Sequence, residues 1–232
     1  RDNTREYWNL VRSVLVMTVI DTVILGSFSF VINVVNGSAT LNQWYLFLLV
    51  PTVACMLAVL TSIPLTSLIA IETFNRGLDP DILVYPILAS VNDIVVTTFF
   101  VGVIFLVLWG GVYFSLLVLM FIGILAGAGY LVSVLRSDRF FQKTLREGTF
   151  VVIISSIFGG INGVLLSNLG PKLAANPGLM TLYPALTNSL GNIGSILGSK
   201  MTTSIALGYS RSFMEELRES SRSILEIEAP AA

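Results

Sequence analysis

Six apolar runs, each long enough to cross a bilayer, dominate this sequence. They cover residues 11–35, 46–72, 82–108, 112–135, 149–170 and 179–209. A helix needs about 20 mostly apolar residues to cross the hydrocarbon core, and the runs lack the strict alternation of barrel strands. Because backbone polar groups inside a membrane must be paired within the chain, we expect the runs to be helices. The sequence therefore predicts an all-α, polytopic membrane helical bundle of about six transmembrane helices.

The basic residues predict how this bundle is oriented. Eleven of the 13 Lys and Arg residues lie on one side of an alternating six-helix arrangement, in segments 1–12, 73–81, 136–148 and the tail after 210. Only Lys172 lies on the other side, and Lys200 lies inside the last run. Basic segments stay in the cytoplasm, so we expect both termini there, in a multi-pass protein of the cell membrane. Aromatic residues typical of the interface lie near the opposite helix ends: Trp44, Tyr45, Trp109 and Tyr113.

Composition narrows the chemistry of any binding site. Charged residues make up 12% of the chain, against about 25% in a typical soluble domain. The chain has one cysteine and no histidine, so it forms no internal disulfide, and any bound metal is expected to be a hard cation with oxygen ligands. The pI of about 5.4, with the basic residues at the cytoplasmic surface, gives no reason to expect a nucleic acid partner.

Asp93, inside the third run, is the most informative polar residue. An ionised side chain in a membrane span costs roughly 2.5–3.5 kcal/mol on insertion scales, and such residues usually mark a functional site. Asp93 shares one helical face with Pro86, Ala89 and Thr97, and Asn92 lies beside it. This stripe predicts the lining of an ion path. The alternative is that Asp93 only forms a hydrogen bond to a neighbouring helix.

A second polar stretch lies in the last run. Asn188, Asn192 and Ser195 fall on one helical face, next to a groove of small residues that includes Gly191, Gly194 and Gly198. Side-chain carbonyl oxygens suit Ca²⁺ or the water shell of Mg²⁺, which makes this face a candidate site. The alternative is close helix packing with amide cross-links.

Asp21 interrupts the first run and is the next candidate site residue. It could equally pair with another helix. Residues 159–163, which include Gly159, Gly160 and Gly163, form a patch suited to the close approach of a second helix. After residue 210, apolar and charged residues separate onto opposite faces, which predicts an amphipathic cytoplasmic helix.

Two motifs resemble a known family. The sequence Gly-Leu-Asp-Pro-Asp at 77–81, followed by Pro86 and the Asn92-Asp93 pair, resembles the fifth transmembrane helix of MgtE-type magnesium transporters. The sequence at 184–203, with its Gly-Asn-Ile-Gly-Ser core, resembles the second helix of that family. The pattern is most similar to the two-repeat solute-carrier magnesium transporters and the archaeal MgtE-like proteins. The resemblance covers most of residues 10–210 and implies an MgtE-like transmembrane domain.

The order of the motifs departs from a single family repeat, because the acid motif comes first. The resemblance implies four segments: the end of a first repeat (1–111), a linking transmembrane helix (112–136), the start of a second repeat (137–210) and the amphipathic tail (211–232). The chain is then the middle of a longer two-repeat protein, or a permuted unit completed by a partner chain.

The resemblance also implies roles for individual residues. Asp93 matches the central ion-binding acid, Ala89 matches a backbone site one turn earlier, and Asn192, with Gly191 and Ser195, lies on the second-helix motif. The implied activity is passage of hydrated Mg²⁺, or another divalent cation, between two repeats, without catalysis. A second acid from the other repeat has no counterpart at a matching position here. The expected partners are therefore membrane lipid, the cation, and either a second copy or the remaining repeat halves.

Three other classes remain open. Asp93 could carry a proton or Na⁺ in a coupled secondary transporter. Asp21 and Asp93 could be the two acids of an intramembrane aspartyl protease, although the usual Gly-x-Gly-Asp sequence is absent. The chain could also be a membrane assembly subunit that transports nothing and is held to its partners by the small-residue grooves.

Overall fold

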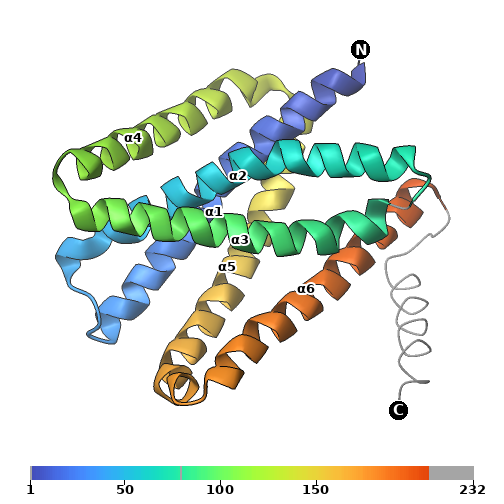
Figure 1. The fold of residues 1–232 in the computed structure, drawn as a ribbon. Coiled ribbons are helices and arrows are strands. Elements are labelled where there is room, and N and C mark those ends of the chain that lie inside the picture. The colour runs from blue at the N-terminus through green and yellow to red at the C-terminus, as the bar shows by residue number, and fades with distance from the viewer. Residues whose placement is uncertain (1, 79, 209–232) are drawn as a thin grey trace. The chain divides into compact units, whose positions relative to one another are not determined.

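The computed structural model describes residues 2–78 and 80–208, which form helices joined by short connections (Figure 1). In chain order these are α1 (Asp2–Val35), the short η1 (Leu41–Gln43), α2 (Trp44–Asn75), α3 (Pro80–Trp109), α4 (Gly111–Val134), the short η2 (Leu135–Ser137), α5 (Arg139–Ala174) and α6 (Pro177–Ala206). No strand occurs in this described part. The all-α prediction is therefore confirmed.

Five stretches in the described residues are long and apolar enough to cross a membrane. They are Thr4–Val35, Leu41–Asn75, Ile87–Trp109, Gly111–Ser137 and Arg139–Leu166. These stretches confirm a polytopic membrane bundle and correspond to the first five predicted runs. The sixth run is helical as α6, but its crossing of the membrane stays a prediction, as does the cytoplasmic placement of the termini.

The structure corrects one predicted connection. Segment 136–148 was expected to be a basic cytoplasmic loop, but most of it is the first part of α5, which begins at Arg139. Asp138 stabilises this start, since its Oδ1 accepts a hydrogen bond of 2.9 Å from the backbone N–H of Phe141. Charged residues therefore extend a helix beyond its apolar part. The predicted amphipathic tail lies outside the described residues.

The connection between α3 and α4 is a tight turn at Gly110 and Gly111. Their φ values are 66° and 53°, a left-handed conformation that favours glycine. The turn brings aromatic rings together at this end of the helices. The Trp109 and Tyr113 ring centroids are 5.4 Å apart, and those of Tyr45 and Phe114 are 6.0 Å apart. Tyr45, Trp109 and Tyr113, which are predicted to lie at the membrane interface, thus form ring contacts at one end of α2, α3 and α4.

The chain divides into two compact units, which are described separately. The first comprises Arg1–Pro64 and Asn92–Lys172, and the second comprises Leu65–Val91 and Leu173–Ala232. In the first unit, α2, α3 and α4 share a buried apolar cluster: Leu49, Val53, Ala54, Val103 and Leu117. This cluster positions the part of α3 that belongs to the first unit, from Asn92 onward, and Asp93 lies at its start.

Within the first unit, α1 packs against α2 through small and polar residues. The hydroxyl of Thr52 donates a hydrogen bond of 3.1 Å to the hydroxyl of Thr22. A Cβ added at Gly26 would collide with the backbone carbonyl of Phe47, so glycine permits this close approach. The Phe30 and Phe47 rings lie 5.6 Å apart, between centroids. The two helices run antiparallel, as consecutive membrane spans should.

Helix α1 also packs against α5, and these two run parallel. Asn9 donates a hydrogen bond of 3.0 Å to Asp138 at the start of α5. Further along, Met17 lies against Gly148 and Phe28 lies against Gly160. The contact at Gly160 confirms that the glycine patch admits a second helix closely. A parallel pair is what the predicted alternating arrangement requires of the first and fifth spans.

The second unit contains the end of α2, the beginning of α3 and helix α6. Helix α6 begins at Pro177, whose missing N–H does no harm in a first turn. The buried residues described in this unit are Thr73, Val84, Leu88 and Met201.

Candidate ion-binding site

Asp93 lies on a face of α3 that the described part of the chain leaves uncovered. Its side chain is exposed, as are those of Ile94 and of Thr97 one turn later. No described residue forms a hydrogen bond or an ion pair with Asp93 in this structure. Its carboxylate and the Thr97 hydroxyl both present oxygen atoms that suit a hard cation.

Asn92 faces a different direction from Asp93. It is half-buried, and its side-chain oxygen accepts a short hydrogen bond of 2.6 Å from the hydroxyl of Ser62 on α2. The atom of Asn92 that would bind a cation is thus engaged in joining α2 to α3. Ala89, one turn before Asp93, is half-buried. The side chain of Pro86 lies outside the described residues.

The candidate residues of the last run all lie on α6. Asn192 and Ser195 are half-buried, and Gly191 is exposed. A Cβ added at Gly191, Gly194 or Gly198 would meet no described atom within 4 Å, so the small-residue face is open here. Asn188 lies within the helix, but its side chain is outside the described residues.

Asp21 has a partner on another helix. It is half-buried on α1, and its Oδ1 accepts a hydrogen bond of 2.9 Å from the hydroxyl of Ser156 on α5. The predicted alternative, pairing with another helix, is therefore what the structure contains. Asp21 lines the contact between α1 and α5, while Asp93 lies on the uncovered face of α3.

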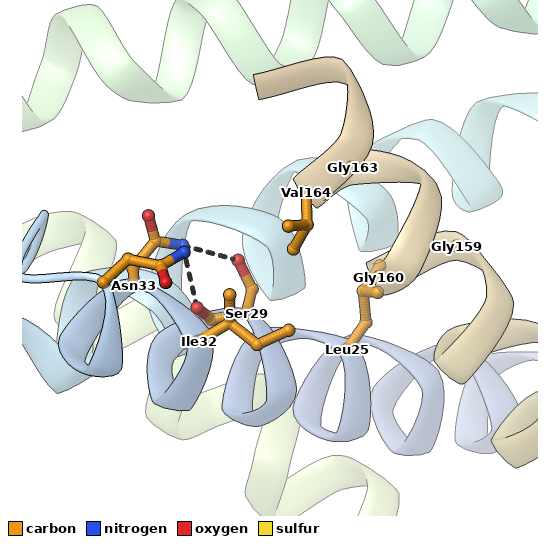
Figure 2. Close-up of a pocket in the computed structure, with 9 residues that line it drawn as sticks. Leu25, Ser29, Ile32, Asn33, Gly159, Gly160, Gly163 and Val164 are labelled. Carbon is orange, nitrogen blue, oxygen red and sulfur yellow. Dashed lines mark hydrogen bonds between the residues drawn. The ribbon is translucent and has the colours of Figure 1, made fainter. Parts of the chain in front are cut away.

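The sequence analysis missed the polar residues that lie between α1 and α5. Ser156, which donates to Asp21, is one of them, and Figure 2 shows others in a pocket between the two helices. Asn33 donates hydrogen bonds to the backbone carbonyl and the hydroxyl of Ser29, at 2.8 and 3.5 Å, while Gly160 and Gly163 line the opposite wall. The signal was available, because Thr18, Asp21, Ser29 and Asn33 share one helical face of the first run.

Metal-ligating side chains are sparse in the part of the chain that the structure describes. No three His, Cys, Asp or Glu residues lie together there. A divalent cation bound to these residues would therefore keep most of its ligands as water. Mg²⁺ fits such a site, because it gives up its water reluctantly and is commonly held by one or two carboxylates.

Comparison with known proteins places this geometry in context. Residues 1–103 match the MgtE family, described as divalent cation transporters. The chain is 24% identical over 213 residues to solute carrier family 41 member 3 of Rattus norvegicus, which covers 87% of the chain and 45% of that relative. The protein of the same name from Mus musculus is also 24% identical, with 87% of the chain and 42% of the relative covered.

The chain thus spans less than half the length of the curated relatives it matches. No solved structure matches it. The resemblance to MgtE-type transporters and their solute-carrier relatives, predicted from the two motifs, is confirmed. The matched region 1–103 contains the acid motif and Asp93.

Proposed function

We propose that this MgtE-like chain forms part of a membrane path for divalent cations, chiefly Mg²⁺, and that Asp93 binds the ion in that path. One observation carries the proposal: Asp93 lies in a membrane-length helix, yet no described residue covers it. A carboxylate facing lipid costs roughly 2.5–3.5 kcal/mol on insertion scales. In the assembled protein, its face is therefore expected to meet water or further polypeptide.

The chemistry of Mg²⁺ suits a site with a single carboxylate from this chain. Asp93 would hold the hydrated ion through water, with the hydroxyl of Thr97 and the backbone near Ala89 along the same face of α3. Asn92 would contribute mainly by fixing α3 against α2 through Ser62. If Asp93 is not the ion-binding acid, Asp21 is the next candidate. On this proposal the chain acts by binding and passage, without catalysis.

The residues of α6 are proposed to line the ion path from the second repeat. Asn192 would bind the water shell of the ion through its amide, with Asn188 and Ser195 on the same helical face and Gly191 leaving room beside them. The repeat boundaries predicted above, with residues 112–136 as a linking helix, are retained as part of this proposal.

A complete path requires more protein than this chain. The resemblance implies a second acid, and no residue occupies the matching position. The chain spans less than half of its relatives, which supports completion by the remaining repeat halves of a longer protein. A homodimer is the other arrangement that would supply the second acid. We propose the cell membrane as the location of this multi-pass protein.

Mg²⁺ uptake into proteoliposomes tests the role of Asp93. The complete protein carrying this chain would be reconstituted with a Mg²⁺-sensitive dye inside, as wild type and as Asp93→Asn. We expect uptake by the variant to fall to the level of empty vesicles, because the amide lacks the charge that attracts the cation. Glu72→Gln is the matched control, since Glu72 is an exposed carboxylate at a helix end, paired with Arg76, and its loss should leave uptake unchanged.

Several outcomes would contradict the proposal. Undiminished uptake by a folded Asp93→Asn protein would remove Asp93 from the path. Uptake that follows an imposed H⁺ or Na⁺ gradient would instead indicate a coupled transporter. If wild-type protein, folded by circular dichroism and gel filtration, gives no uptake, the chain belongs to an assembly subunit that transports nothing.

A further inference from the structure

The seam between α1 and α5 contains polar residues at several levels, among apolar residues and glycines. The parallel helices are joined by hydrogen bonds at Asn9–Asp138 and Asp21–Ser156. Two cavities open along this seam, and they meet near the Asp21–Ser156 hydrogen bond: the lining of one on α1 ends at Asp21, and that of the other begins at Leu25. The role proposed for Asp93 uses none of these residues.

The first cavity contains carboxylates and hydroxyls. It has a volume of about 580 Å³ and lies toward the N-terminal ends of α1 and α5. Its polar lining comes from Thr18 and Asp21 of α1 and from Thr144 and Glu147 of α5. Both charged side chains in this lining are negative, so the cavity favours cations over anions.

The second cavity is uncharged but polar, and it lies toward the other end of the seam (Figure 2). It has a volume of about 310 Å³, and its polar side chains are those of Ser29, Asn33 and Asn36. Asn33 uses its amide nitrogen as the donor to Ser29, which leaves its side-chain oxygen as an acceptor. The glycines of α5 make room on the opposite wall. Oxygen acceptors in a cavity of this size suit water or a hydrated cation.

Together the two cavities extend across the thickness of a membrane. Their lining on α1 begins at Val14 and ends at Asn36. At a rise of 1.5 Å per residue this stretch of helix is about 33 Å long, and the hydrocarbon core of a bilayer is about 30 Å thick. The two linings on α1 are separated between Asp21 and Leu25, where the Asp21–Ser156 hydrogen bond joins the helices.

We infer that the α1–α5 seam is a second, cation-selective aqueous path through this protein, separate from the face of α3 that carries Asp93. Asp21 supplies the negative charge near the point where the two cavities meet. Ser156 holds that carboxylate in place, and the hydrogen bond between them closes the path between the two cavities. Neither described lining contains Lys or Arg, so no fixed positive charge there opposes a cation. The inference does not depend on the role proposed for Asp93.

Cysteine labelling with charged, membrane-impermeant methanethiosulfonates tests this path without relying on transport. The chain has a single native cysteine, so Cys55→Ser provides the background. Thr18→Cys and Asn33→Cys place a thiol in each cavity. Leu119→Cys is the matched control, since Leu119 is exposed on the apolar surface of α4. We expect both cavity thiols to react in membrane vesicles, each from its own side, and the control thiol to remain unreactive.

The charge of the reagent tests the assigned role of Asp21. Relative to free cysteine, the cationic reagent should label Thr18→Cys roughly tenfold faster than the anionic reagent, as a focused negative potential predicts. Adding Asp21→Asn should remove most of this preference. The Asp93→Asn substitution should change none of these rates, which separates this result from the uptake experiment.

Two results would overturn the inference. If the cavity thiols react no faster than Leu119→Cys, the seam is dry and its polar residues only join the helices. If both cavity thiols react but Asp21→Asn leaves the charge preference unchanged, the path does not select cations through Asp21. The comparison of the cavity thiols with Leu119→Cys needs no change at Asp21, so misfolding of Asp21→Asn would not prevent the first decision.

Discussion

Asp21 and Asp93 both lie within membrane-length helices, but the chain surrounds them differently. Asp21 faces α5, receives a hydrogen bond from Ser156 and lines a cavity formed by the chain itself. Asp93 lies on a face of α3 that no described residue covers. The first acid is therefore part of the packing of this chain, whereas the second is available to an ion, to water or to protein that the chain does not contain. This contrast is tested by experiments that distinguish an acid packed against another helix from an acid that is open to an ion or to a partner.

The largest loss of stability is expected when a larger side chain is placed in the packed region around α1. Gly26 lies on α1, one turn beyond Asp21, and a Cβ there would collide with the backbone of Phe47. We expect Gly26→Ala to destabilise the protein by about 1–3 kcal/mol, as overpacking usually does. Gly123→Ala on α4 is the control, because a Cβ there meets no described atom within 4 Å. Thermal unfolding in detergent would measure both, and equal losses would show that the contact between α1 and α2 is wrong.

The Asp21–Ser156 pair should show a coupling of intermediate size. A double-mutant cycle with Asp21→Asn and Ser156→Ala should give about 1–2 kcal/mol, because hydrogen bonds to charged groups are stronger than neutral ones and the largest couplings measured between membrane helices are near 1.7. Asp93→Asn, measured in the same way, should not destabilise this chain. A coupling near zero, or a comparable loss from Asp93→Asn, would remove the contrast between the two acids.

The Ser62–Asn92 hydrogen bond tests whether Asn92 belongs to the packed region or to the ion path. Ser62→Ala and Asn92→Ala should each cost about 0.6 kcal/mol of stability, the average for such pairs in a membrane protein. If Asn92 acts only by joining α2 to α3, both variants should lower Mg²⁺ uptake equally and slightly. A loss of uptake confined to Asn92→Ala would assign the amide a direct part in binding the ion.

The sequence predicted the helices because the physics that determines them is local. Run length against bilayer thickness and the need to pair backbone groups are both properties of a single segment. Where a helix begins or ends outside the membrane depends also on contacts with other helices, as segment 136–148 shows. Its basic residues predict a loop, yet Arg139, Lys143 and Arg146 lie in α5, because Asp138 caps the start of that helix and Asn9 of α1 binds the cap.

The partners of the site residues could not be predicted from the sequence in the same way. Asp21 was identifiable as a rare intramembrane acid, but Ser156 lies 135 residues away and resembles any other serine. Asn92 was grouped with Asp93 because the two are adjacent, although neighbouring residues on a helix point in different directions. Only the packing of α2 against α3 reveals that Asn92 faces Ser62. The periodicity of the sequence predicts which residues share a helical face, whereas the packing of the helices determines which residues that face contacts.

The smallest loss of stability is expected from an exposed charged residue at the end of a membrane-length helix. Glu72 and Arg76 form an ion pair of 2.7 Å at the end of α2, with 58% and 69% of their side chains exposed. Because water screens such pairs, we expect Glu72→Gln to cost only about 0.3–0.5 kcal/mol, with the difference lost in high salt. Unfolding at low and high ionic strength would measure it. A larger, salt-independent loss of stability would mean that other protein covers this end of α2. The surface of the chain that a partner covers would then include the end of α2 as well as the Asp93 face of α3.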